Sequence, residues 1–206
     1  MPVVDARGRV IGSPLEKEQA PKSKVISYDR IKDIIENIPS LRTRAIVATQ
    51  YALAARIGEL IVYRHPSLGF ETQGLLKQNI EYHEKSKVFT CTIPNFKNKK
   101  QPFKKPFISV TEKFVFEPFA RWYKQTGEQV FPLKFSRIRQ LISEALPSGF
   151  STHALRHSRA THLAEQFNFN AYEIKAFLGH ARLDTSAIYV TQDLTRSANK
   201  LKEGLI

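Results

Sequence analysis

The fold of this chain is decided by residues 151–163, which read STHALRHSRATHL. Small, apolar and basic residues without proline or glycine predict a helix over residues 152–166. His153 and Arg156 are three positions apart and therefore share one face of that helix. They also lie near its N-terminus, where unpaired backbone amides attract anions. An arginine fork beside an imidazole suits a phosphate group, so a phosphate is the expected occupant of this face.

Downstream, a glycine turn and a tyrosine follow at a defined spacing. The segment Phe177-Leu178-Gly179-His180 predicts the end of a helix over residues 171–178, for which Asn170 is a candidate N-cap. Tyr189 comes nine residues after His180, within a short helix expected over residues 183–190. Taken alone, a tyrosine in this context is more often a packed aromatic side chain than a nucleophile, and only its distance from His180 favours the second reading.

Upstream, an alanine-rich helix predicted over residues 42–55 is apolar on most sides and is therefore expected to be buried. It places Arg56 at its C-terminal end, and Glu59 could either orient that guanidinium or cap the following turn. A preceding helix is expected over residues 28–38, between Ser27 as N-cap and Pro39 as stop.

The rest of the chain predicts an α+β fold, mostly α-helical with a small antiparallel sheet. Residues 88–96 and 103–110 are β-prone runs separated by a Lys- and Asn-rich turn, which indicates a hairpin. Residues 63–87 are expected to form a loop with one short strand near 75–82. Further helices are predicted over 112–125 and 136–146, capped by Thr111 and Ser136. The aromatic residues that recur at helical spacing are assigned to the core: Phe114, Phe116, Phe119, Trp122 and Tyr123.

Composition limits the classes of partner. Of 206 residues, 32 are Lys or Arg and 19 are Asp or Glu, giving a formal charge of +13. This excess favours a polyanion, and the spread of basic residues along the chain favours nucleic acid over a membrane surface. A soluble basic protein without such a partner is the plainer alternative. One cysteine, Cys91, and the lack of an apolar leader at Met1 predict a cytoplasmic, nucleoid-associated protein.

The ordered set of these residues resembles the catalytic domain of the tyrosine recombinases, or phage integrases. That family has Arg, a hairpin Lys, His-x-x-Arg, Gly-His and Tyr in this order. The matching residues here are Arg56, a lysine of the 97–100 cluster, His153 with Arg156, His180 after Gly179, and Tyr189. Each motif alone is weak, but the five together in the correct order make coincidence improbable.

The resemblance implies a site-specific recombinase that cleaves and rejoins DNA through a 3′-phosphotyrosine at Tyr189. It implies that Arg56 and Arg156 hold the non-bridging phosphate oxygens and that His180 donates a hydrogen bond there. His153 is our candidate proton acceptor for Tyr189, whose hydroxyl ordinarily titrates near ~10. A hairpin lysine would protonate the leaving 5′ oxygen. The resemblance also implies double-stranded DNA as the partner and a homotetramer on that DNA, and it implies no small-molecule substrate, metal or other cofactor.

The lysine assignment rests on position alone. The family's usual Gly-Lys-Gly turn is replaced by residues 95–100, so Lys97 is chosen because it ends the first strand. The neighbouring cations and one on the His-Arg helix are expected to contact DNA: Lys99, Lys100, Lys104, Lys105 and Arg159. Forty-one residues separate Arg56 from Lys97, which implies an insertion within 64–86.

The expected organisation is an N-terminal linker or extended arm over 1–26 and a catalytic domain over 27–206. Residues 1–26 are too short for the helical DNA-clamping domain that family members usually carry. The tail over 194–206 has apolar residues at helical spacing and is expected to dock on a neighbouring protomer.

Two other functions remain open from the sequence: a type IB topoisomerase and a DNA-binding module without catalysis. A metal site at His153, His157 and His162 is disfavoured because no Cys, Asp or Glu completes a ligand set. Taken alone, His157 and His162 are interpreted as structural.

Overall fold

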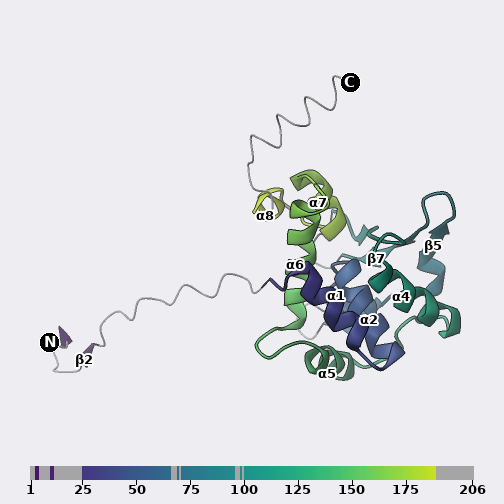
Figure 1. Ribbon diagram of the computed structural model, residues 1–206. Coiled ribbons are helices and arrows are strands. Elements are labelled where there is room, and N and C mark those ends of the chain that lie inside the picture. The colour runs from purple at the N-terminus through teal and green to yellow at the C-terminus, as the bar shows by residue number, and fades with distance from the viewer. Residues whose placement is uncertain are drawn as a thin grey trace, which may run out of the picture.

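The computed structural model describes residues 25–65, 69, 71–95, 98 and 100–188, together with the backbone of two short paired strands, β1 (Val3–Val4) and β2 (Val10–Ile11). Helices dominate the described chain (Figure 1). They are α1 (Tyr28–Asn37), α2 (Leu41–Ala52), α3 (Ile57–Leu60), α4 (Lys113–Gln125), α5 (Phe135–Ala145), α6 (Thr152–Glu165), α7 (Ala171–Leu178) and α8 (Asp184–Ala187), with a 3-10 turn, η1 (Lys77–Asn79).

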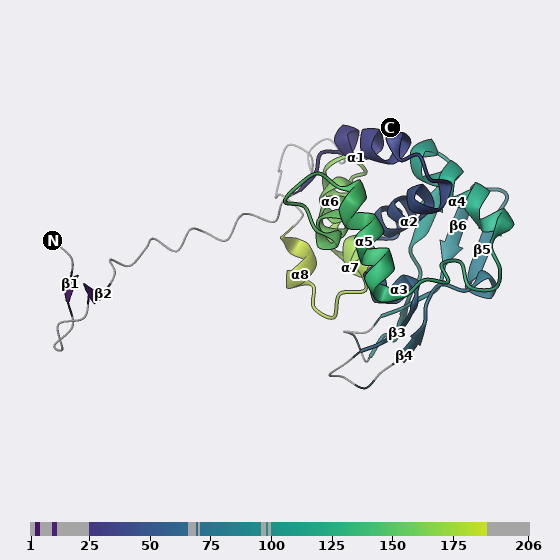
Figure 2. The same ribbon diagram turned by 90° about the horizontal axis from the view of Figure 1, so that it is seen from below.

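The strands are short and antiparallel. β5 (Ile80–His83), β6 (Val88–Cys91) and β9 (Phe107–Ser109) form a three-stranded sheet with β6 in the middle. β7 (Ile93–Pro94) pairs with β8 (Phe103–Lys104) and continues the predicted hairpin. β3 (Val62–Arg64) and β4 (Glu71–Gln73) form a separate ribbon that projects beyond α3 (Figure 2). The fold is therefore mostly α with small antiparallel sheets, as predicted.

Helix α2 is the centre of the main core, because alanine on most sides lets neighbours approach from several directions. Every residue from Ala45 to Ala52 is buried. Helices α1, α4 and α5 pack around α2, and Phe89, Phe119 and other aromatic side chains join the sheet to α4. The assignment of the aromatic residues of α4 to the core is confirmed for Phe114 and Phe119, which are buried, while the other three are partly buried and pack against the core. This rigid centre fixes the end of α2, from which Arg56 follows.

A smaller cluster joins α6 to α7 through Ala160, Leu163, Ile174 and Leu178. Behind it lies a buried polar network. The guanidinium of Arg159 donates to both carboxylate oxygens of Glu112 at 2.6 and 2.7 Å. This pair holds α6 against the start of α4, so the helix that bears His153 and Arg156 has a fixed orientation.

The bounds of the expected helices are confirmed within one or two residues, with two exceptions: α2 ends at Ala52, three residues before the predicted end, and the last helix is shorter, ending at Ala187 within the described chain. The expected caps are confirmed only in part. Asn170 accepts hydrogen bonds from the backbone amides of Tyr172 and Glu173. Ser136 lies inside α5 rather than before it, and α4 begins after Glu112 rather than Thr111. The loop expected over 63–87 contains β4 and β5 and most of β3, so it is more structured than the sequence predicts.

Candidate active site

Arg56 lies at a turn between α2 and α3 that is organised by Glu59. The Glu59 carboxylate accepts a hydrogen bond from the Arg56 backbone amide at 2.9 Å and one from its guanidinium at 2.7 Å. Glu59 is fully buried, whereas the Arg56 side chain keeps 21% of its surface exposed. The sequence suggested that Glu59 either orients the guanidinium or caps the turn, and its side chain does both.

Arg156 is held from two directions. Its guanidinium donates to the carbonyl oxygen of Ala54 and, at 3.0 Å, to that of Leu178. Ala54 adopts the left-handed backbone conformation, with φ of 45°, as the chain leaves α2. The end of α2, the first turns of α6 and the end of α7 therefore meet at this one side chain.

A third cation enters the same cluster from the hairpin. The ammonium of Lys104 lies 2.9 Å from Glu59 and donates to the Leu178 carbonyl at 3.3 Å. The Lys104 and Glu59 side chains both have 0% exposure. Glu59 thus contacts Arg56 and Lys104, and the Leu178 carbonyl accepts from Lys104 and Arg156.

His180 is placed by a glycine turn that also contacts the hairpin. Gly179 ends α7 with φ of 71°, which favours glycine, and its carbonyl accepts a hydrogen bond from the Asn95 amide at 2.8 Å. The His180 Nδ1 lies 2.8 Å from the Ser186 hydroxyl at the base of α8. Ser186 therefore holds the imidazole ring, and Asn95 holds the backbone turn that precedes it.

The charges of the cluster shift each other's ionisation. Burial opposes ionisation of Glu59, but Lys104, Arg156 and Arg56 outweigh it and hold its pKa below the usual value. Burial, with a smaller contribution from Arg156, lowers the pKa of Lys104 to about 7 even though Glu59 opposes the shift. Burial and the charges of Arg156, Arg56 and Lys104 lower the pKa of His180 to about 4. Arg56, Arg156, Lys104 and His180 thus lie close enough to affect one another's pKa values. Together they form a site that suits an anion.

The structure brings Arg56, Glu59, Arg156 and His180 together. His153 lies in the first turn of α6 and is exposed. Lys97, Lys99, Tyr189 and the tail over 194–206 lie outside the described residues, and their roles stay predictions.

The cations expected to contact DNA fall into two groups. Lys100 and Lys105 are exposed. Lys104 and Arg159 have 1% and 2% exposure, and each is ion-paired to a buried carboxylate. Their contacts are internal, so their side chains offer almost no surface to DNA in this conformation.

Three supporting residues were not identified from the sequence as parts of the site. Gln50 donates to the carbonyls of Ala55 and Thr152, which ties the end of α2 to the start of α6. Asn95 and Lys104 reach the end of α7 from the hairpin. No sequence pattern distinguishes Gln50. Lys104 could have been noticed, because it is a lysine within the strand that follows the hairpin turn.

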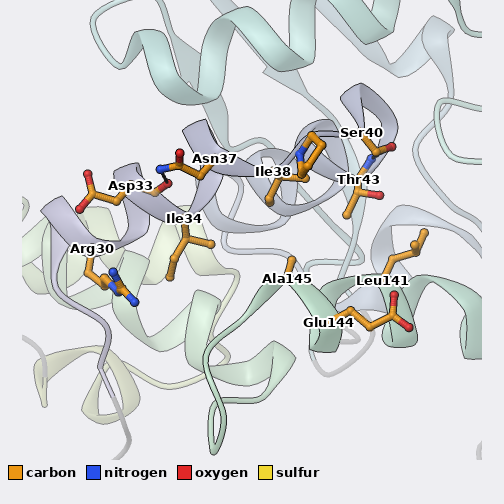
Figure 3. A pocket seen from close by; sticks show the side chains of 11 residues that line it. Arg30, Asp33, Ile34, Asn37, Ile38, Ser40, Thr43, Leu141, Glu144 and Ala145 are labelled. Atoms are coloured by element: carbon orange, nitrogen blue, oxygen red, sulfur yellow. Dashed lines mark hydrogen bonds between the residues drawn. The ribbon is translucent and has the colours of Figure 1, made fainter.

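A groove of about 500 Å³ lies elsewhere, between α1, the start of α2 and α5 (Figure 3). Ile34, Leu141 and Ala145 contribute its apolar surface, and Asp33 and Glu144 its acidic groups. It contains none of the residues predicted to be catalytic. Among the described residues, no group of three or more His, Cys, Asp or Glu side chains is arranged to hold a metal ion. No helix in the described part of the chain is both long and apolar enough to cross a membrane.

A sequence profile described as the phage integrase family matches residues 24–196, which include every residue assigned above to catalysis. The chain belongs to this family. The tyrosine recombinase XerA of Pyrococcus furiosus is 27% identical over 202 residues, covering 93% of this chain and 64% of that protein. Tyrosine recombinase XerC of Alcanivorax borkumensis is 25% identical, covering 87% and 61%. The chain thus spans somewhat less than two thirds of the length of these relatives.

Solved structures agree on the fold. The crystal structure of XerA recombinase superposes with a TM-score of 0.59 at 19% identity, covering 88% of this chain and 65% of that one. XerH site-specific recombinase bound to its difH substrate gives 0.58 at 16% identity, with 96% and 58% coverage. The catalytic domain of bacteriophage HP1 integrase gives 0.52 at 18% identity, with 85% and 93% coverage. The described chain therefore has the fold of a tyrosine recombinase catalytic domain.

Proposed function

We propose that this protein is a site-specific DNA recombinase that cleaves and rejoins strands through a covalent 3′-phosphotyrosine intermediate. The observation that carries the proposal is the convergence of Arg56, Arg156 and His180 on one site, with Tyr189 nine residues beyond His180 in the sequence. Membership of the phage integrase family supports the same reading.

The two arginines suit the charge that develops during phosphoryl transfer. Attack on a phosphodiester produces a phosphorane with extra negative charge on its non-bridging oxygens. Arg56 and Arg156 are already oriented by Glu59 and by the carbonyls of Ala54 and Leu178, so little reorganisation is needed when the phosphate arrives. Removing one such donor typically costs ~3 kcal/mol of transition-state stabilisation, or roughly a hundredfold in rate.

Proton transfers complete the proposed reaction. The Tyr189 hydroxyl attacks phosphorus and loses its proton, for which His153 is the proposed acceptor. The bond between phosphorus and the 5′ oxygen breaks, and that oxygen takes a proton from a hairpin lysine. Lys97 is the proposed donor. His180, whose pKa is lowered to about 4, is neutral at pH 7 and donates a hydrogen bond to a phosphate oxygen. The new phosphotyrosine bond retains the energy of the broken phosphodiester, so a second strand's 5′ hydroxyl can reverse the step on a new partner.

The proposed partner is double-stranded DNA, and the proposed assembly is a homotetramer on two duplexes. Exposed Lys100 and Lys105 on the hairpin are proposed to contact backbone phosphates, with Lys99 beside them. The tail over 194–206 is proposed to link protomers. This function places the protein on DNA in the cytoplasm.

A plasmid assay tests the proposal. The protein is incubated with supercoiled plasmid in EDTA, quenched with detergent and examined for covalently attached protein, with Tyr189→Phe as the matched control. We expect attachment that survives EDTA and disappears in the variant. If random plasmid gives none, the protein is offered a library of nicked duplexes with randomised sequence. No adduct on either substrate would contradict the proposal and favour a DNA-binding module.

Partner exchange separates recombination from topoisomerase activity. A recombinase joins strands from two labelled duplexes, whereas a type IB topoisomerase relaxes one plasmid without exchange. Relaxation alone, with no joint product on duplexes recovered from the library, would favour the topoisomerase.

A further inference from the structure

Lys104 is a buried cation whose place in the site is not explained by DNA contact. Its ammonium approaches two acceptors, the Glu59 carboxylate at 2.9 Å and the Leu178 carbonyl at 3.3 Å. Each acceptor also contacts one arginine of the proposed site. Glu59 accepts from Arg56 at 2.7 Å, and the Leu178 carbonyl accepts from Arg156 at 3.0 Å.

We propose that Lys104 is a positioning residue that joins the supports of Arg56 and Arg156, and so sets the separation and orientation of the two guanidinium groups for a DNA phosphate. The inference rests on the proposed strand-cleavage function. It assigns no proton transfer to Lys104, because the side chain has 0% exposure and both of its contacts are with the protein interior.

The connection spans three separate parts of the chain. Lys104 lies on β8, Glu59 on α3, and Leu178 at the end of α7. Residues 59, 104 and 178 are far apart in sequence, so Lys104 adds a tertiary link between the two arginines beside the hydrogen bond from Arg156 to the Ala54 carbonyl. Asn95 adds a parallel link from the hairpin to the Gly179 carbonyl at 2.8 Å. The hairpin therefore contacts two successive carbonyls at the turn that presents His180.

Stability alone is a poor explanation for this arrangement. A buried ion pair gains little over apolar side chains of similar shape, because the desolvation of both charges offsets their attraction. An ammonium between a carboxylate and a carbonyl does, however, restrict the orientation of both acceptors. A displacement of about 1 Å at a catalytic group can cost about a hundredfold in rate, so a positioning role is large enough to measure.

The charge state of Lys104 is consistent with this role. Burial and the charges of Arg156 and Arg56 lower the pKa of Lys104, and Glu59, its counter-charge, raises it. A bound phosphate adds negative charge beside these cations, which favours the protonated ammonium. The contacts to Glu59 and Leu178 are thus strongest when substrate is present.

Lys104→Met tests the proposal against Lys124→Met. The two variants remove the same charge, one from a lysine buried in the site and one from an exposed lysine in the last turn of α4 that has no role in the proposed site. The rate of covalent adduct formation is measured on nicked duplexes recovered from the randomised library by the wild-type protein. We expect Lys104→Met to slow this rate by about 10- to 100-fold and Lys124→Met to leave it within about twofold of the wild-type rate. Equal rates for the two variants would overturn the proposal.

A second substrate separates positioning from proton donation. A duplex with a bridging 5′ sulfur at the cleaved bond has a leaving group that needs no proton. Under our proposal Lys104→Met is slowed on this substrate by a factor similar to that on the oxygen substrate. Recovery of the wild-type rate would overturn the positioning role and identify Lys104 as the proton donor.

The double variant Glu59→Gln with Lys104→Met guards against a trivial loss of folding. It removes both buried charges, so it is expected to be more stable than Lys104→Met alone. Because Glu59 also orients Arg56, slow adduct formation is expected in this variant, and a folded double variant with the wild-type rate refutes the proposal. These results differ from a failure of the proposed strand-cleavage function, in which the wild-type protein itself would form no adduct.

Discussion

Replacement of Gly179 by alanine probes the contact between the hairpin and the His180 turn. Gly179 has φ of 71°, so alanine there costs about 1–2 kcal/mol of backbone strain. Its Cβ would lie 2.5 Å from the Asn95 Nδ2. The Asn95 Cγ would also be only 2.8 Å away, so the whole amide must swing about the Cα–Cβ bond, which breaks its hydrogen bond to the Gly179 carbonyl at a cost of about 1 kcal/mol. Gly179→Ala should therefore lower the free energy of unfolding by about 2–3 kcal/mol.

A double-mutant cycle isolates the contact. Asn95→Ala alone loses the same hydrogen bond, at about 1 kcal/mol. In the double variant that bond is lost only once, so the combined effect should be about 1 kcal/mol smaller than the sum of the single effects. Urea unfolding followed by circular dichroism measures all four proteins. Additivity within about 0.3 kcal/mol would refute the proposed contact.

Three further predictions concern the buried groups. Arg159→Met leaves the Glu112 carboxylate buried without its counter-charge and should lower the free energy of unfolding by about 3–5 kcal/mol, as measured by urea unfolding. Adding Glu112→Leu removes the unpaired carboxylate and should recover most of this loss. A double variant as unstable as Arg159→Met would contradict the ion pair. Burial, followed by the charge of Arg159, lowers the pKa of His162 to about 4. The unfolded chain therefore binds more protons than the folded one below about pH 6.5, and the free energy of unfolding should fall between pH 6.5 and 4. In urea unfolding at several pH values, His162→Phe should show a smaller fall over this range, and a fall equal to that of the wild-type protein would count against this explanation. Ala54→Gly should relieve about 1–2 kcal/mol of strain at φ of 45°, but it adds the entropy cost of glycine and removes a buried methyl group, so the free energy of unfolding should change little; a loss above about 1.5 kcal/mol in the same assay would show that the strain is absent.

The helices could be predicted because their apolar residues recur with a clear period and their ends carry recognisable signals. Asn170 is such a signal, and its side chain accepts from two backbone amides as expected. The ribbon of β3 and β4 was missed because its strands are only three residues long and largely exposed. Gly74 indicated a turn, but its close approach to the Ile61 backbone is a tertiary feature that no local pattern shows.

The arginines and His180 of the site could be predicted because their residue types follow the order and spacing of the family motif that the chain resembles. The supporting contacts could not. In β8 the usual alternation is reversed, since Phe103 is 55% exposed while Lys104 is 1% exposed. Arg159 shares a helix with Arg156, and only its tertiary contact with Glu112 distinguishes an internal ion pair from a DNA contact. Such roles depend on partners that lie many residues away in sequence.

The central claim is that Tyr189 becomes covalently attached to DNA, and peptide mapping of the adduct tests it most directly. Adducts captured on the nicked library in EDTA are digested with nuclease and trypsin, and the peptides are sequenced by mass spectrometry. Cleavage after Arg182 and Arg196 releases residues 183–196, in which Tyr189 is the only tyrosine. We predict a nucleotide linked through its 3′ phosphate to Tyr189 in this peptide. A nucleotide on another residue, or an adduct that persists in Tyr189→Phe, would contradict the account.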